Sequence, residues 1–224
     1  MKFSVIICDP AWKFSDKLSM SNTPRAADAN YKTMSNQDII NLDVKSISDP
    51  NGCVLALWVP SSILQTGLDV MKAWGFTQKQ TYVYVKVKHD KSLGKLLGKV
   101  ANYLPLVENV SETVKYFVGD ALLNFGLGRL FRSSHEICLI GINNTKIYKK
   151  LENKSQRSVC FAENKGHSVK PENLHRSLEL MFTGNDIKLL EMFARRPVKG
   201  WTTIGNEVCN GEDIKVSIEK LKNG

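Results

Sequence analysis

The 224-residue sequence lacks long hydrophobic runs and any regular cysteine spacing. No run of about 18 consecutive apolar residues occurs, so the sequence predicts no membrane-spanning helix. The apolar segment 1–8 is too short for a signal peptide. The five cysteines are odd in number and none lies at a Cys-x-x-Cys spacing. We therefore expect reduced thiols in a cytoplasmic protein, with neither disulfides nor a zinc site.

Positive charge is abundant but unevenly distributed along the chain. The net charge is +9, yet residues 1–80 hold 8 Lys+Arg against 7 Asp+Glu. Residues 145–170 hold 7 basic and 2 acidic residues. Such an excess can draw a polyanion towards one face of a protein, although it can equally serve solubility alone. A nucleic-acid partner is one reading of this segment.

The apolar pattern indicates one α/β domain over residues 1–210, which suits 42% hydrophobic and 24% charged residues. Buried or alternating strands are predicted at 3–8, 54–59, 81–87, 136–142, 158–162, 187–194 and 202–205. Helices are predicted from a cap at Ser35 to Leu42, from a cap at Ser61-Ser62 to Gly75, and over 171–181. Strands that alternate with helices favour a mostly parallel sheet.

Two segments stand apart from this alternation. Residues 88–128 carry two apolar helical stripes and a row of lysines at Lys91, Lys95 and Lys99, which predicts a two-helix insertion. The lysine row either contacts phosphates or forms a solvated face. Residues 211–224 are polar, then weakly helical, and are interpreted as a tail.

The tetrapeptide Asp9-Pro10-Ala11-Trp12 ends the first strand, where open α/β sheets place their ligands. An aspartate and a proline carbonyl can both accept hydrogen bonds from an exocyclic amine. An aromatic ring nearby can stack on a planar base. The same four residues also fit an ordinary strand end with the tryptophan in the core, so this motif alone leaves the question open.

Further blocks follow this motif in a fixed order. They are Tyr31-Lys32-Thr33-Met34-Ser35, Leu57-Trp58, Ala73-Trp74-Gly75-Phe76, Val83-Tyr84-Val85-Lys86, 136–141, 167–172, 191–196, Gly200-Trp201 and Gly205-Asn206-Glu207. The ordered set resembles the MT-A70 family of adenine-N6 methyltransferases. The resemblance implies a permuted Rossmann-like methyltransferase fold, with S-adenosylmethionine as the cofactor.

The resemblance also implies the site residues. The motif Asp9-Pro10-Ala11-Trp12 matches the family's Asp-Pro-Pro-Trp active site, with Ala11 as the one departure. Residues implied to hold the cofactor are Asp9, Lys170, Glu191, Phe193, Arg195, Asn206 and Glu207. Residues implied on the substrate side are Trp12, Tyr31, Lys86, Arg132, His167 and Ser168. No metal site is expected, because no ligand cluster accompanies His135 and Glu136.

The expected activity is methylation of the N6 amine of adenine in DNA, by a phage or bacterial enzyme of the cytoplasm. The insertion at 88–128 is expected to help select the target. RNA adenosine methylation is the alternative substrate class. A catalytically inactive nucleic-acid-binding paralogue is the alternative of another kind, although Asp9 and Trp12 are both present. The sequence does not distinguish a monomer from a homodimer.

Overall fold

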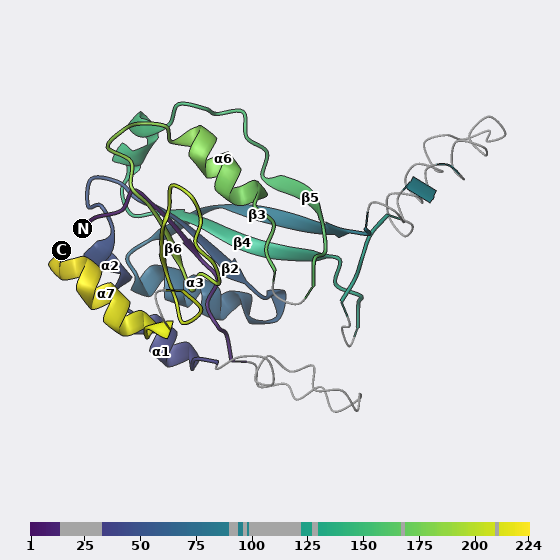
Figure 1. Cartoon of the computed structure of the whole chain (residues 1–224), viewed down its shortest axis with the longest axis horizontal. Helices are drawn as coiled ribbons and strands as arrows, with labels where there is room; N and C mark the ends of the chain where they lie inside the picture. The colour runs from purple at the N-terminus through teal and green to yellow at the C-terminus, as the bar shows by residue number, and fades with distance from the viewer. Residues whose placement is uncertain are drawn as a thin grey trace.

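A seven-stranded sheet forms the centre of the molecule, with strand order β5-β3-β4-β2-β1-β6-β7 (Figure 1). The computed structural model describes residues 1–13, 33–89, 94–95, 98, 122–126, 130–166, 169–208 and 211–224. The strands are β1 (Val5–Cys8), β2 (Val54–Val59), β3 (Thr77–Val87), β4 (His135–Ile142), β5 (Val159–Glu163), β6 (Leu189–Met192) and β7 (Thr202–Ile204). This mostly parallel α/β architecture confirms the predicted fold class.

Helices cover both faces of the sheet (Figure 1). They are α1 (Asn36–Ile40), α2 (Val44–Ile47), α3 (Leu64–Ala73), α6 (Asn173–Met181) and α7 (Ile214–Asn223), with 3-10 turns η2 (Ser61–Ile63) and η5 (Thr145–Lys150). Successive residues of a strand point to opposite faces of the sheet and pack into two separate hydrophobic cores. Ile6 and Cys8 pack on the face of α1, α2, α3 and α7, whereas Val5 and Ile7 pack on the face of α6. Strands β1 and β2 are buried throughout, because both of their faces are covered.

Strand direction brings the ligand-binding ends of the sheet together. Among the strands of the described residues, only β4 runs antiparallel to its neighbours β2 and β3. The carboxyl ends of the other strands therefore share one edge with the amino end of β4, and we call this the carboxyl edge. The next strand after β1 is β2, which lies on one side of β1. Strand β6 lies on the other side of β1, and the strand after it, β7, lies further out on that side. The topological switch point, where such sheets bind ligands, lies between β1 and β6.

The helix boundaries test the sequence prediction closely. Ser35 caps α1 as predicted, since its side chain accepts a hydrogen bond from the Asp38 amide. Gly75 ends the α3 region with a φ of 84°, and the next amide donates back to the Met71 carbonyl. The predicted cap at Ser61-Ser62 is wrong. These two serines lie inside η2, which has no side-chain cap hydrogen bond, because Pro60 already sets the entry into the turn.

The tail prediction is also wrong in part. Residues 214–223 form the ordered helix α7, which buries Ile214 and Ile218 in the core beneath α2. Most of the predicted insertion lies outside the described residues. Residues 122–126, near the end of this insertion, are described. Leu123 forms an antiparallel bridge with Val87 of β3, and Gly126 forms one with Ser133, which precedes β4. Four of the cysteines are buried free thiols, as predicted, and Cys209 lies outside the described residues.

Candidate functional site

The backbone of the Asp9-Pro10-Ala11-Trp12 motif is fixed by hydrogen bonds directly after β1. The Pro10 carbonyl accepts from the Trp12 amide at 2.8 Å. The Ala11 carbonyl accepts from the Met34 amide at 2.8 Å. Ala11 is thus anchored through its own backbone carbonyl. A carbonyl oxygen has two lone pairs, so Pro10 keeps acceptor capacity for a ligand.

Trp12 departs from its predicted role as a stacking platform. Its side chain is only 3% exposed and belongs to the core. The indole N–H donates to the Trp58 carbonyl at 2.9 Å, which joins the motif to the end of β2. A buried ring offers no open face to a base. The prediction of stacking is therefore corrected to an anchoring role that holds the motif against β2.

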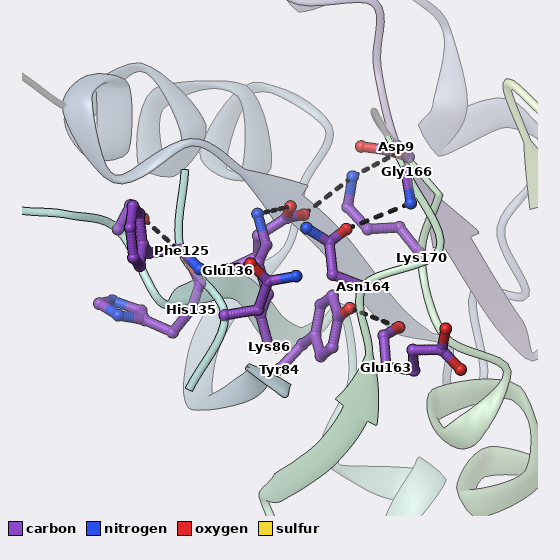
Figure 2. A network of polar contacts seen from close by, with 12 residues as sticks. Asp9, Tyr84, Lys86, Phe125, His135, Glu136, Glu163, Asn164, Gly166 and Lys170 are labelled. Carbon is purple, nitrogen blue, oxygen red and sulfur yellow. Dashed lines mark hydrogen bonds and ion pairs between the residues drawn. The ribbon is translucent and has the colours of Figure 1, made fainter. Parts of the chain in front are cut away.

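A row of alternating charges leads from Asp9 through Lys170 and Glu136 to Lys86 (Figure 2). The Nζ atom of Lys170 lies 2.8 Å from Oδ2 of Asp9 and 3.1 Å from Oε2 of Glu136. The other Glu136 oxygen lies 2.7 Å from Nζ of Lys86. The Lys170 ammonium also stands over the ring of Trp58, 5.6 Å from its centroid. Asp9 retains 29% side-chain exposure, so a ligand can still reach it.

Burial and charge act in opposite directions on these groups. Burial raises the pKa of Asp9, and the Lys170 ammonium only partly offsets that rise. Burial alone would lower the pKa of Lys170, but the carboxylates of Asp9 and Glu136 outweigh it and the pKa rises. Burial would raise the pKa of Glu136, but Lys170 and Lys86 hold that pKa below its ordinary value. Of these two carboxylates, Asp9 is therefore the one whose raised pKa favours taking up a proton.

Glu136 is the site residue that sequence reasoning missed. It was predicted as the start of a strand and was considered, with His135, only as a possible metal ligand, which was rejected. Its role arises from the antiparallel register, which places it opposite Tyr84 and beside Lys86. The alternation of Tyr84 and Lys86 on one face of β3 was visible in the sequence. The register was not, because the insertion at 88–128 separates the two strands.

Two lysines of the predicted site are already paired with protein carboxylates. Lys170 was predicted to hold a cofactor carboxylate, yet it already binds two protein carboxylates. Its three donors leave one N–H for a ligand. Lys86 was predicted on the substrate side, but its ammonium pairs with Glu136 and its side chain is only 15% exposed. Lys170 therefore lies against both Asp9 and Glu136, and Lys86 lies against Glu136 alone.

The predicted cofactor residues gather at the ends of β6 and β7. Phe193 directly follows β6 and has a φ of 59°, an uncommon and costly conformation for a non-glycine residue. Its neighbour Ala194 is bonded to Ile204 of β7. A Cβ at Gly205 would lie 2.7 Å from the Ala194 carbonyl oxygen, so only glycine allows this close approach. The strained turn at Phe193 and the close approach at Gly205 bring together the backbone that follows β6 and the backbone that follows β7. We call these two strand ends the cofactor cradle.

Polar groups on that cradle fit a cofactor with hydroxyl, amino and carboxylate groups. Asn206 and Glu207 follow β7 and are exposed. Arg195 pairs with Glu207 at 3.6 Å. Its charge also opposes, in part, the rise that burial causes in the pKa of Asp9. Oε2 of Glu191 is buried and has no aligned hydrogen-bond donor. The Glu191 side chain is still 21% exposed, so its other oxygen can accept from a donor group on a ligand, and these residues fit S-adenosylmethionine.

The substrate-side predictions are less completely placed. Tyr31, His167 and Ser168 lie outside the described residues. Arg132 lies before β4, with its guanidinium 5.9 Å from the centroid of the Phe125 ring. Among the described residues, no group of three His, Cys, Asp or Glu side chains is arranged to hold a metal ion, and no described helix is long and apolar enough to span a membrane.

The basic segment 145–170 does not form one face. Its first part, η5, follows the end of β4, whose last residue Ile142 pairs with Val54 at the start of β2. Lys146, Lys149 and Lys150 therefore lie at the edge opposite the motif. Lys165, just after β5, lies at the carboxyl edge. The structure thus corrects the expectation that this segment draws a polyanion to a single surface.

One cavity of about 380 Å³ also lies away from the motif. It is lined by Lys2, Lys45, Ser48, Pro50, Trp74, Gly75 and Asn143. These residues flank the starts of β1 and β2 and the end of the α3 region, so this cavity belongs to the opposite edge. The charged groups that meet at the switch point, rather than the cavity, define the candidate site.

The sheet order, the single antiparallel strand β4 and the polar site at the switch point define a Rossmann-like methyltransferase fold. The sequence profile of one family, MT-A70, matches residues 3–104 and 112–207. The chain therefore belongs to the MT-A70 family, as its ordered motifs predicted. Methyltransferases of this family take their methyl group from S-adenosylmethionine.

Curated relatives agree with this membership. The N(6)-adenosine-methyltransferase MT-A70-like protein of Drosophila melanogaster is 24% identical over 211 residues, which cover 92% of this chain and 27% of the relative. The catalytic subunit METTL3 of Homo sapiens is 21% identical over 209 residues, 92% of this chain and 28% of the relative. The non-catalytic subunit MTB of Arabidopsis thaliana is 31% identical over 146 residues, 64% of this chain and 14% of the relative. The chain spans less than a third of the length of each.

Proposed function

We propose that this chain transfers a methyl group from S-adenosylmethionine to the N6 amine of adenine in DNA. The observation that carries the proposal is Asp9 at the switch point, held by Lys170 and still partly exposed. Phe193, Gly205 and Asn206 form the neighbouring cradle for the cofactor. Bound S-adenosylmethionine supplies a methyl group on a positively charged sulfur, so the chain needs to contribute position and hydrogen-bond acceptors.

Asp9 and Pro10 would act on the adenine amine. The amine has two N–H groups, and the Asp9 carboxylate and the Pro10 carbonyl can accept one each. As the N6–methyl bond forms and the sulfur–methyl bond breaks, the nitrogen becomes acidic and loses one proton. The raised pKa of Asp9 makes its carboxylate the better acceptor for that proton. Lys170 and Glu136 keep the carboxylate in place during the transfer.

Two substrate classes fit the site. DNA is the first candidate, because the exposed Lys165 at the carboxyl edge can contact its phosphates. RNA is the second candidate, because the names of the Drosophila and human relatives specify adenosine, the ribonucleoside. If the substrate is duplex, the adenine has to leave the stack to reach Asp9.

The test is a methyl-transfer assay with matched substrates. The chain is incubated with methyl-labelled S-adenosylmethionine and with DNA or RNA oligonucleotides of the same mixed sequence, single- and double-stranded. Nucleosides are then released and separated. We expect labelled N6-methyldeoxyadenosine in excess over N6-methyladenosine. Label in the ribonucleoside alone would replace DNA by RNA as the substrate.

A non-catalytic role is the alternative suggested by the relative MTB, which is named as a non-catalytic subunit. The retained Asp9, with its Lys170 and Glu136 partners, argues for catalysis in this chain. The same assay distinguishes the two. No labelled nucleoside from DNA or RNA, in a preparation that binds S-adenosylmethionine, would favour the non-catalytic role.

A further inference from the structure

Helix α6 and the residues before it connect three strands of the site. Lys170, three residues before α6, binds Asp9 at the end of β1. His175, in the first turn of α6, lies 3.1 Å from Glu191 of β6 through its Nε2 atom. The same imidazole packs edge-on against Trp201, which directly precedes β7, with ring centroids 4.9 Å apart. One short segment thus contacts the catalytic strand and both cofactor strands.

The surroundings of His175 fix its ring. Trp201 donates its indole N–H to the Glu179 carboxylate at 2.6 Å, and Glu179 lies one turn further along α6. The Trp201 ring is therefore held by the helix that carries His175. The His175 side chain is 12% exposed, and both of its ring nitrogens are buried from solvent. This packing leaves the imidazole little freedom to turn away from Glu191.

The Glu191 carboxylate has few other ways to be oriented. Glu191 pairs in register with Ile7 of β1 and Thr203 of β7, and its side chain is 21% exposed. Its Oε2 atom lies within ion-pair distance of His175 but forms no aligned hydrogen bond. A buried carboxylate oxygen without an aligned donor is costly, so the nearest N–H decides where this group points.

We propose that His175 is a positioning residue for S-adenosylmethionine, acting by orienting the Glu191 carboxylate towards the cofactor cradle. The inference rests on the proposed placement of the cofactor between β6 and β7. His175 itself touches no reacting atom. Its effect belongs to cofactor binding, whereas Asp9 belongs to the methyl transfer. The two functions meet on one segment, residues 170–175, which carries Lys170 at one end and His175 at the other.

Calorimetric titration of the whole chain with S-adenosylmethionine tests this. His175→Ala removes both the N–H and the ring, His175→Phe keeps the ring against Trp201, and His175→Gln places an amide N–H near the former Nε2 position. We expect the dissociation constant to rise roughly tenfold for Ala and Phe, because a buried charge-assisted contact is lost. Gln should restore most of the affinity. Leu180→Ala, an exposed site on the same helix, is the matched control and should bind like wild type.

A coupling measurement separates orientation from general packing. Glu191→Gln should weaken binding, and adding His175→Ala to it should cause no further loss, since the histidine acts through that carboxylate. Additive losses, equal affinity of the Phe variant and wild type, or failure of Gln to restore binding would overturn the proposal. A wild-type chain that binds S-adenosylmethionine but methylates no nucleic acid overturns the proposed function and leaves this inference standing. The deciding comparison is between the dissociation constant of the double variant for S-adenosylmethionine and those of the two single variants.

Discussion

At the scale of single residues, the site depends on how unequally its charges are stabilised. Lys170 serves two carboxylates, and Glu136 receives a second lysine that Asp9 does not have. Burial therefore raises the pKa of Asp9 while the pKa of Glu136 falls. A carboxylate with a raised pKa, such as Asp9, can take a proton, while a neighbour with a lowered pKa, such as Glu136, keeps its charge.

Replacing Glu136 by Gln tests this inequality through pH. Burial is the main cause of the raised pKa of Asp9, and the negative charge of Glu136 raises it further. Removing that charge should lower the pKa of Asp9. In the proposed mechanism the carboxylate form of Asp9 is the active one, so activity is lost as pH falls through this pKa. We expect the acid limb of kcat/KM to move to lower pH in Glu136→Gln. A limb that stays in place or moves to higher pH would contradict the account.

A matched control is available on the adjacent strand. Glu163 ends β5 at the same edge but is absent from the groups that act on the pKa of Asp9. Glu163→Gln should leave the acid limb where it is in the wild type. A shift of the same size in both variants would point to a general change of charge.

At the scale of elements, the sequence predicted best where local chemistry decides the structure. The buried runs of β1 and β2, the Ser35 cap and the Gly75 stop all follow from neighbouring residues. Trp12 was misjudged because only the packing of β2 shows that its N–H finds the Trp58 carbonyl. Helix α7 was underestimated because its sequence is polar on one side and its order comes from a core that forms elsewhere.

Helix α7 should therefore contribute to global stability. Ile218 is 2% exposed in the core, whereas Val216 on the same helix is 47% exposed. Ile218→Ala should lower the free energy of unfolding by about 2–5 kcal/mol, because it leaves a cavity. Val216→Ala should change it by about 0.5 kcal/mol or less. Urea denaturation of both variants checks the difference, and equal effects would mean that α7 is a peripheral tail after all.

At the scale of the whole molecule, the basic charge divides between two edges of the sheet. The sequence suggested one basic segment, but the antiparallel course of β4 carries η5 to the edge opposite Asp9. Only the end of the segment, with Lys165, returns to the carboxyl edge. A substrate strand at Asp9 would meet Lys165 and would not meet Lys149.

Salt dependence of DNA binding tests this division. Lys165→Ala and Lys149→Ala each remove one exposed positive charge. Loss of one phosphate contact should reduce the slope of log K against log salt by about 0.9. We expect this reduction for Lys165→Ala and an unchanged slope for Lys149→Ala. The opposite result would place the nucleic acid on the edge that carries η5.

The central claim is that Asp9 carries the methyl transfer at a site assembled between β1 and β6. The most direct measurement is single-turnover methyl transfer by Asp9→Asn, with cofactor and nucleic acid saturating and cofactor affinity measured in parallel. The substitution keeps the shape of the side chain and removes its charge. We predict a rate lower by roughly 100-fold or more, with cofactor affinity near that of the wild type. A variant that transfers methyl groups at the wild-type rate would contradict the account.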